Sequence, residues 1–284
     1  MKKVLVLGST GMLGHVLYNY LDDFSKYNLF NLSFRKKLNS ETTIIDVSDF
    51  DKLRDYILEI KPNFIVNCIG VLINGSKQNF KNAIYINAYL PHLLNELCNS
   101  INSKLIHIST DCVFSGKTGG YDENSIKDAI DDYGKTKSLG EFNSDSNLCI
   151  RTSIIGPEIK QNGEGLLHWL FQQKGKVSGY KNVFWSGVTT FELSKAIEFS
   201  IENNVNGLWN LTNRDPISKY HLLKIIINIF SLNNIELVED FEKTSNKSLK
   251  SIRDIDYEVS TYDSMIKEMF DNFKKNRVLY NYNI

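Results

Sequence analysis

Short apolar runs alternate with segments of helical periodicity along the first half of the chain. The apolar runs predict strands at residues 2–8, 28–34, 42–47, 63–70, 103–110 and 147–155. Between them, apolar residues recur every three or four positions, which predicts helices at 12–21, 48–61, 83–101 and 131–142. Because strands that are apolar throughout must be covered on both faces, we predict an α/β protein with a doubly wound parallel sheet.

The alternation stops after Gly156-Pro157, where glycines become frequent. Helical periodicity returns at 189–202 and 218–230, and residues 207–212 predict a late strand. We therefore expect two unequal parts, residues 1–156 and a smaller substrate-binding part at residues 157–284. Within the second part, a segment at about 186–213 is expected to return to the first.

Composition excludes several classes of function. Lys plus Arg and Asp plus Glu both total 33 in 284 residues, so no basic excess favours nucleic acid as a partner. The apolar run Val4–Leu7 is too short for a signal peptide, and no run is long enough to span a bilayer. The cysteines and histidines lack metal-ligand spacing. We expect a cytoplasmic protein with no metal site and no membrane partner.

A glycine-rich segment, "GSTGMLG" at residues 8–14, joins the first strand to the first helix. Gly8, Gly11 and Gly14 permit a tight turn and a close approach of the backbone to a pyrophosphate. The helix that follows offers unpaired N–H groups and a partial positive charge to the same anion. This context predicts that residues 1–156 form a Rossmann domain that binds a dinucleotide.

The end of the second predicted strand indicates which dinucleotide binds. It reads "SFRKK", with Arg35 and Lys36 where an acid would bind the ribose 2′-hydroxyl of NAD. A guanidinium suits a 2′-phosphate, so we expect NADPH, with NADH as the alternative. Asp46 and Val47 end the third strand and are expected to border the adenine.

Hydroxyl groups and a Tyr–Lys pair are expected at the same edge of the sheet. The strand 103–110 ends in Ser109 and Thr110, and Tyr133 and Lys137 lie one turn apart on the following helix. A phenol has a pKa near 10, and we expect the Lys137 ammonium to lower the pKa of Tyr133 so that it suits proton transfer. A second Tyr-x-x-x-Lys, Tyr220 to Lys224, follows the late strand and is interpreted as packing and surface.

Five segments together resemble the extended short-chain dehydrogenase/reductases, and most closely the dTDP-4-dehydrorhamnose reductase-like nucleotide-sugar reductases. They are "GSTGMLG", "VNCIG", "ISTDCVFSG", "YGKTKSLGE" and "IRTSIIGP". The resemblance is dense over residues 1–157 and weaker beyond. It implies a catalytic set of Thr110, Tyr133 and Lys137.

The binding residues that we expect form two groups. Those expected to contact the cofactor are Gly8, Thr10, Gly11, Met12, Leu13, Gly14, Arg35, Lys36, Asp46, Val47, Cys68, Ile69, Gly70, Asn87, Ser109, Tyr133 and Lys137. Those expected to contact the substrate are Val71, Asp111, Cys112, Arg151 and Trp185. Further candidates are Lys160, Arg214 and Lys219 for a diphosphate, Trp169 for a base, and Leu72 and Asn74 for a sugar.

The resemblance implies NADPH-dependent reduction of the C4 ketone of a 4-keto-6-deoxy nucleotide sugar, for deoxysugar and surface polysaccharide biosynthesis. One alternative is a UDP-2-acetamido-2,6-dideoxy-4-keto-hexose reductase, whose relatives also resemble "STDCVFSG". Another class of protein with this fold is a non-catalytic, NADP-binding regulatory subunit, such as the beta subunit of methionine adenosyltransferase.

Three departures from the relatives narrow these expectations. Cys112 stands where rhamnose-pathway reductases typically have Tyr, and Thr110-Asp111-Cys112 lacks the Glu with which sugar 4,6-dehydratases remove water. Relatives that form a metal-linked homodimer often carry an acid after the glycine segment, where this chain has His15-Val16. A homodimer is one assembly that the resemblance allows.

Overall fold

Seven parallel strands form the central sheet in the order β10-β6-β5-β4-β1-β2-β3 in the computed structural model, which describes residues 1–282 and 284. The strands are β1 (Lys2–Leu7), β2 (Tyr27–Ser33), β3 (Thr43–Ile44), β4 (Phe64–Asn67), β5 (Lys104–Thr110), β6 (Leu148–Thr152) and β10 (Gly207–Asn210). The order reverses between β1 and β4, and ligands of such sheets bind at the carboxyl ends on either side of that point. The predicted α/β class with a doubly wound parallel sheet is confirmed.

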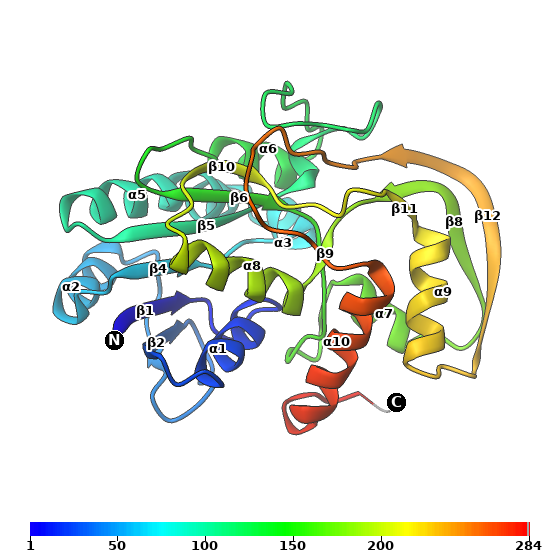
Figure 1. Ribbon diagram of the computed structural model, residues 1–284, viewed down its shortest axis with the longest axis horizontal. Coiled ribbons are helices and arrows are strands. Elements are labelled where there is room, and N and C mark those ends of the chain that lie inside the picture. Colours follow the sequence, from blue (N-terminus) through cyan, green and yellow to red (C-terminus); the bar gives the residue numbers. More distant parts are fainter. Residues whose placement is uncertain (283) are drawn as a thin grey trace.

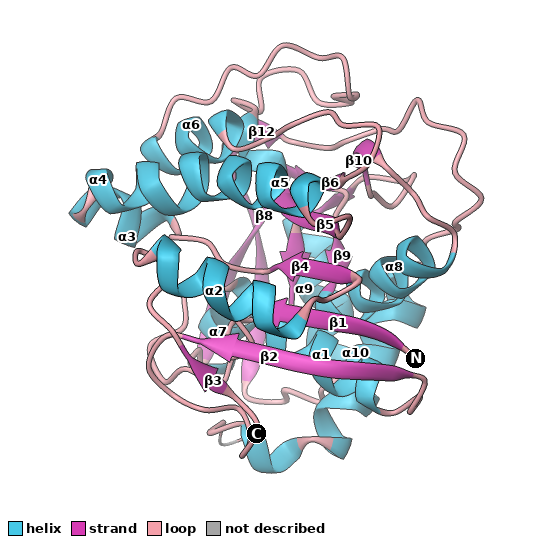
Figure 2. Ribbon diagram, turned by 90° about the vertical axis from the view of Figure 1, so that its left-hand side faces the viewer, coloured by secondary structure: helices cyan, strands magenta, loops and turns pink. Residues whose placement is uncertain are grey.

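Helices cover both faces of the central sheet (Figure 2). Successive residues of β1 from Val4 to Leu7 point to opposite faces and are apolar, so both faces need a covering layer. Leu5 and Leu7 pack in one core cluster with helices α2 (Phe50–Ile60) and α5 (Leu90–Ser100). Val4 and Val6 pack in the other with helices α1 (Gly14–Asp22) and α8 (Thr190–Glu202). The apolar run predicted for this strand is therefore buried on both sides.

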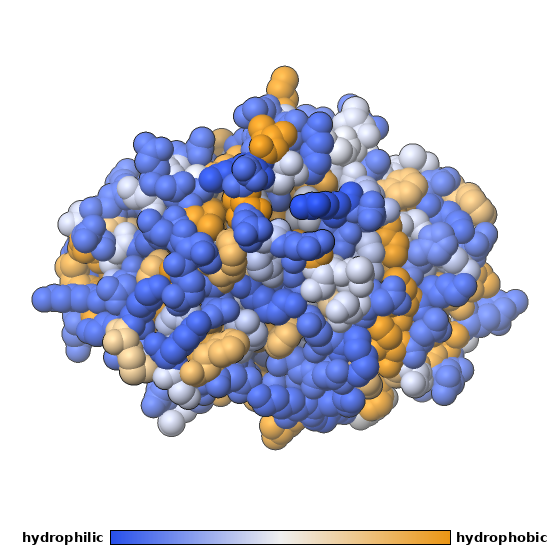
Figure 3. Space-filling model, viewed as in Figure 1, coloured by the Kyte–Doolittle hydropathy of each residue, from blue (hydrophilic) through white to orange (hydrophobic). Residues whose placement is uncertain are grey.

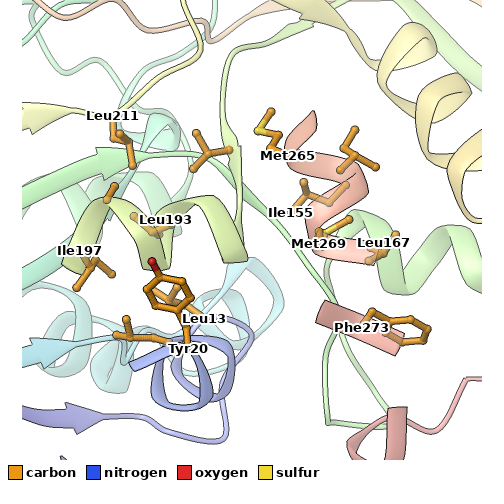
Figure 4. Close-up of a cluster of buried hydrophobic side chains, with 14 of the residues drawn as sticks. Leu13, Tyr20, Ile155, Leu167, Leu193, Ile197, Leu211, Met265, Met269 and Phe273 are labelled. Carbon is orange, nitrogen blue, oxygen red and sulfur yellow. The ribbon is translucent and has the colours of Figure 1, made fainter. Parts of the chain in front are cut away.

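The larger core joins the sheet to the C-terminal part of the chain. Figure 4 shows Leu13 and Tyr20 near Leu193 and Ile197 of α8. Farther along the same cluster, Met265, Met269 and Phe273 of α10 (Tyr262–Lys275) pack with Leu167 of α7 (Leu166–Phe171). This continuous core holds α10 against α7 and α8.

A three-stranded sheet forms a smaller lobe beside the central sheet (Figure 1). In it, β8 (Gly175–Trp185) lies between β11 (Ile217–Ser218) and β12 (Ile235–Asn246), and α9 (Lys219–Ile229) packs against β8. The sequence predicted a glycine-rich loop region where β8 lies and no element where β12 lies. Most residues of β12 are polar and only partly covered, so they lack the apolar pattern from which a strand is predicted.

Several boundaries also differ from the prediction. The expected helix 83–101 is α4 (Phe80–Ala83), a π-helix (Ile84–Tyr89) and α5, and Pro91 in the first turn of α5 has no N–H to donate. The expected strand 147–155 ends at β6, and β7 (Ile154–Ile155) then pairs with β9 (Val188–Thr189). The remaining short elements are α3 (Ile73–Gln78), α6 (Asp132–Leu139) and two 3-10 turns, Asp111–Val113 and Arg277–Leu279.

Polar side chains predominate on the face in Figure 3, and apolar side chains form a band toward its right-hand side and smaller groups elsewhere. Within residues 1–282 and 284, no helix is long and apolar enough to cross a bilayer, and no cluster of His, Cys, Asp and Glu could hold a metal ion. The division at residues 156 and 157 stays a prediction.

Candidate functional site

Two neighbouring cavities, of about 400 and 530 Å³, lie at the carboxyl ends of the central strands. Residues that follow β1 and β4 line both of them, and one residue from beyond the central strands, Lys160, also lines both. The shared residues are Thr10, Gly11, Cys68, Ile69, Gly70 and Lys160. The two cavities are therefore adjacent parts of one cleft at the point where the strand order reverses, and together they have the volume of a cofactor site.

The glycine segment forms the floor of this cleft. Gly8 has φ +83°, a left-handed conformation that favours glycine, and a Cβ on Gly14 would lie 2.2 Å from the Gly8 carbonyl oxygen. This close approach lets α1 begin directly beneath the turn, and Thr10, Gly11, Met12 and Leu13 line the cleft. The residues present therefore fit a dinucleotide whose pyrophosphate lies over the turn.

His15 fixes the turn from below. It is fully buried, its Nδ1 lies 2.7 Å from the Gly11 carbonyl oxygen, and its Nε2 lies 2.9 Å from the Tyr280 hydroxyl. Burial lowers the pKa of His15 to about 4, so the imidazole is neutral at neutral pH. The C-terminal segment thereby contacts the glycine turn through one side chain.

The second cavity has the residues expected at an adenosine end. Arg35, Asp46 and Val47 line it, and the Arg35 guanidinium lies 4.7 Å from the centre of the Phe34 ring. Lys36 lies outside the residues that line this cavity, and its carbonyl oxygen accepts a hydrogen bond from the Ser33 hydroxyl. Of the two cations predicted to bind a 2′-phosphate, only Arg35 is placed for it.

The first cavity brings the predicted catalytic side chains together. Thr110, Tyr133 and Lys137 line it with Ser109, Asp111 and Cys112. Asp131 caps α6 by accepting a hydrogen bond of 2.8 Å from the Gly134 N–H, which begins the helix next to Tyr133. A Cβ on Gly134 would lie 2.2 Å from the Cys112 carbonyl oxygen. The glycine between Tyr and Lys thus lets α6 approach the turn that follows β5.

The charges of Tyr133 and Lys137 differ from the expectation. Burial raises the pKa of the Tyr133 phenol above its usual value, although a hydrogen bond with Thr110 acts in the opposite direction. Burial lowers the pKa of the Lys137 amine to about 8. Its Nζ donates a hydrogen bond of 2.6 Å to the Ile108 carbonyl oxygen. Burial therefore raises the pKa of Tyr133, whereas the sequence predicted that Lys137 would lower it.

Two predicted substrate contacts are also corrected. Arg151 is 1% exposed, and its guanidinium makes hydrogen bonds of 2.8 and 2.6 Å with the Glu141 carboxylate, outside the residues that line either cavity. Trp185 is 3% exposed and packs on Tyr262, with ring centres 5.8 Å apart. Both side chains are occupied by other parts of the chain, which leaves neither available to a substrate.

Other predicted residues support the cleft or lie elsewhere. Asn87 is buried and makes hydrogen bonds with both the N–H and the carbonyl oxygen of Val71, so it holds the backbone after β4. Val71 lines the second cavity rather than the first, which Leu72 lines. Tyr220 and Lys224 lie on α9 in the smaller lobe and line neither cavity; Tyr220 is partly buried and Lys224 is exposed.

One segment of the cleft wall was missed by the sequence analysis. Glu158, Ile159, Glu164 and Gly165 line the first cavity, and Glu158 is 6% exposed. Its carboxylate accepts a hydrogen bond of 2.7 Å from the Gly165 N–H, which closes the segment into a loop. The Gly156-Pro157 pair that precedes this loop marked only the end of the alternating pattern.

The RmlD substrate binding domain family matches residues 1–254 of the chain. The chain belongs to this family. The predicted resemblance to extended short-chain dehydrogenase/reductases of the dTDP-4-dehydrorhamnose reductase type is thereby confirmed.

Relatives of two kinds are similar in sequence to this chain. A dTDP-4-dehydrorhamnose reductase from Aggregatibacter actinomycetemcomitans is 30% identical over 168 residues, which cover 57% of this chain and 54% of that protein. The methionine adenosyltransferase 2 subunit beta of Bos taurus is 22% identical over 250 residues, which cover 83% of this chain and 74% of that protein. The chain thus spans about half the length of the first of these relatives.

A solved structure shares the whole fold. The dTDP-4-dehydrorhamnose reductase of Bacillus anthracis str. Ames, in complex with NADP, superposes with a TM-score of 0.79 at 20% identity, and the match covers 95% of this chain and 99% of that one. At this identity the comparison establishes the fold of the chain, including the smaller lobe that the sequence did not predict.

Proposed function

We propose that this protein is an NADPH-dependent reductase that converts the C4 ketone of a 4-keto-6-deoxy nucleotide sugar to an alcohol. The observation that carries the proposal is the convergence of Thr110, Tyr133 and Lys137 on a cavity that continues into the glycine turn. A related reductase whose structure holds NADP supports the choice of cofactor. The names of its relatives support a role in deoxysugar supply for surface polysaccharide.

The reaction needs a proton donor beside the carbonyl oxygen. Bound NADPH would supply the hydride to C4, which leaves negative charge on the oxygen. The raised pKa of Tyr133 keeps the phenol protonated at neutral pH, so it holds a proton to give to that oxygen. Thr110 is next to Tyr133 in the cavity and would orient the ketone by a hydrogen bond.

The cofactor would be held by groups at both ends of the cleft. The glycine turn and the first N–H groups of α1 would contact the pyrophosphate, and Arg35 would contact a 2′-phosphate. Lys137 lines the cavity near Tyr133 and would contact the cofactor from the catalytic side. We place the protein in the cytoplasm, in keeping with its widely spaced cysteines.

The test is turnover by a Tyr133→Phe variant. NADPH oxidation is measured with a panel of dTDP- and UDP-linked 4-keto-6-deoxy sugars, which also separates the UDP-2-acetamido-2,6-dideoxy-4-keto-hexose alternative. Loss of a general acid is expected to lower kcat by roughly 10²- to 10⁴-fold. Tyr220→Phe is the matched control, because Tyr220 belongs to the other Tyr-x-x-x-Lys segment, and it should keep full turnover. Full turnover by Tyr133→Phe would refute the assigned role.

A second candidate, of a different class, is a non-catalytic NADP-binding regulatory subunit. The observation that favours it is the similarity to methionine adenosyltransferase 2 subunit beta over 83% of the chain. Tight NADPH binding without turnover of any ketone in the panel, together with co-purification of a partner enzyme, would support this candidate. Turnover that depends on Tyr133 would exclude it.

A further inference from the structure

A buried histidine lies directly behind Lys137. His107 on β5 is fully buried, and its Nε2 lies 3.3 Å from the Lys137 Nζ. Its other ring nitrogen, Nδ1, lies 3.1 Å from the Nδ2 of Asn67 at the end of β4. The ring therefore connects the side chain of Lys137 to a fixed amide on the neighbouring strand.

The orientation of Asn67 decides which ring nitrogen carries the proton. The Ile69 N–H donates a hydrogen bond of 3.1 Å to Asn67 Oδ1, so the amide nitrogen must face His107. An amide NH₂ can only donate, which makes Nδ1 of His107 the acceptor. Burial holds the pKa of His107 well below its usual value, so the ring is neutral and has one N–H, at Nε2.

That N–H points at Lys137. An ammonium has three donors and no acceptor, so a charged Lys137 would place two donors opposite each other. A neutral amine has a lone pair that accepts from the Nε2–H while one of its own N–H groups still donates to the Ile108 carbonyl oxygen. All of these hydrogen bonds are therefore satisfied together only when the amine is neutral.

We propose that His107, oriented by Asn67, is a positioning residue that favours the neutral amine of Lys137, so that Lys137 changes its charge within the working pH range instead of remaining a permanent cation. The proposal rests on the proposed role of Lys137 beside Tyr133. Neither His107 nor Asn67 lines the cleft. Both act through Lys137, which does line it.

The other groups around Lys137 also influence whether its amine is neutral or charged. Burial lowers the pKa of Lys137 to about 8, in the same direction as the His107 N–H. Cys149 on β6 and Glu141, which follows α6, act in the opposite direction and favour the ammonium. Tyr133 lies one turn away on α6 itself, and its raised pKa keeps it neutral. His107 is thus the neighbour whose hydrogen atom can be moved without changing any charge.

The first test reads the tautomer directly. NMR of the histidine ring nitrogens in the wild-type protein should show His107 protonated at Nε2. Asn67→Asp keeps an acceptor for the Ile69 N–H and adds an acceptor for Nδ1–H, so the proton should move to Nδ1 in that variant. A wild-type ring protonated at Nδ1 would overturn the proposal, and this measurement requires no variant.

The second test reads the charge of Lys137 through NADPH affinity as a function of pH. The pH at which affinity falls should move upward by about one unit in Asn67→Asp, where Nε2 accepts from the ammonium. His107→Phe removes the N–H without adding a charge and should move it in the same direction. His221→Phe alters a histidine on α9 in the smaller lobe and should leave the profile unchanged. An unchanged profile in His107→Phe would overturn the proposal, because that variant adds no charge, whereas the new carboxylate in Asn67→Asp favours the ammonium by itself.

These readouts separate the role of His107 from the proposed reductase function. They use NADPH alone, so they do not depend on the identity of the sugar substrate. If NADPH fails to bind, the proposed reductase function fails, whereas the tautomer of His107 is still measured. If NADPH binds and the tautomer is reversed, only the role of His107 fails.

Discussion

The Arg151 guanidinium and the Glu141 carboxylate form a buried pair joined by two hydrogen bonds, of 2.8 and 2.6 Å. Ser109 donates a further hydrogen bond of 2.6 Å to Glu141, and Arg151 donates one of 3.1 Å to Asn210 on β10. Arg151 also lowers the pKa of Glu141 despite its burial. The pair therefore ties β5, β6 and β10 together beneath the catalytic edge of the sheet.

Removing one partner of this pair should lower the free energy of unfolding. Arg151→Met leaves the buried Glu141 carboxylate with only Lys127, 3.3 Å away and partly exposed, as a cationic partner, which is expected to cost roughly 3 kcal/mol of stability. The double change to Arg151→Met and Glu141→Leu should recover much of that loss, because no charge is then buried alone. Urea unfolding measures both. The exposed pair Lys267–Asp271 is the control, since Lys267→Met should cost far less stability than Arg151→Met. Equal costs for the buried and exposed changes would contradict this account.

Gly134→Ala should lower turnover more than it lowers NADPH affinity. A Cβ at this position would lie 2.2 Å from the Cys112 carbonyl oxygen, so α6 must move away from the turn after β5. A displacement of about 1 Å at the reacting groups can cost roughly 10²-fold in rate. The measurement is kcat with NADPH saturating, and Ser138→Ala on the same helix is the control. Unchanged kcat in Gly134→Ala would mean that the close approach is not needed.

The central sheet could be predicted because its strands are covered on both faces. Residues such as Val4 to Leu7 are all fully buried, which produces a continuous apolar run that is visible in the sequence. Strands β8 and β12 could not be predicted in this way. They pair with each other, with Ile235 opposite Gly175, although they are far apart in the sequence. Few residues of β8 and none of β12 are fully buried, so neither strand has a continuous apolar run.

The residues of the site were likewise predictable only where they follow from local sequence patterns. Thr110, Tyr133 and Lys137 could be placed at one edge because strand ends and helix starts follow from local patterns. Arg151 could not be assigned correctly, because its partner Glu141 follows another element and only the fold brings the two together. The loop that contains Glu158 and Gly165 has no periodicity, and its position over the cleft depends on contacts such as that of Tyr282 with the Glu158 N–H.

Acid should destabilise the protein through His15. The folded pKa is about 4 and the ordinary value is 6.5, so the unfolded chain binds more protons between these values. The stabilising contribution is complete above about pH 6.5 and is lost as the pH falls toward 4, with a maximum near 3 kcal/mol. Urea unfolding at about pH 7 and about pH 4.5 should show a smaller acid loss in His15→Gln than in the wild type. Equal losses would contradict the assignment to His15.

Arg35 should determine the preference for NADPH. Its guanidinium lines the second cavity, whereas Lys36 does not. A hydrogen bond to a charged group contributes roughly 1.5–3 kcal/mol, so Arg35→Ser should raise the KM for NADPH by about 10- to 100-fold. The KM for NADH should change little, because NADH has no 2′-phosphate. Lys37→Ser is the control for loss of a nearby positive charge. An equal effect on both cofactors in Arg35→Ser would place the 2′-phosphate elsewhere.

Lys160 should assist cofactor binding without taking part in the chemistry. It lines both cavities and is exposed, so its ammonium can approach the phosphates from the solvent side of the cleft. An attraction of about 1 kcal/mol is reasonable for an exposed charge, and its loss in Lys160→Ala should raise the KM for NADPH roughly fivefold while kcat stays unchanged. The effect should shrink at high salt, because exposed charges are screened. Lys174→Ala is the control, since Lys174 lines neither cavity. A higher KM for the sugar nucleotide with an unchanged KM for NADPH in Lys160→Ala would instead assign this side chain to the substrate diphosphate, as the sequence first suggested.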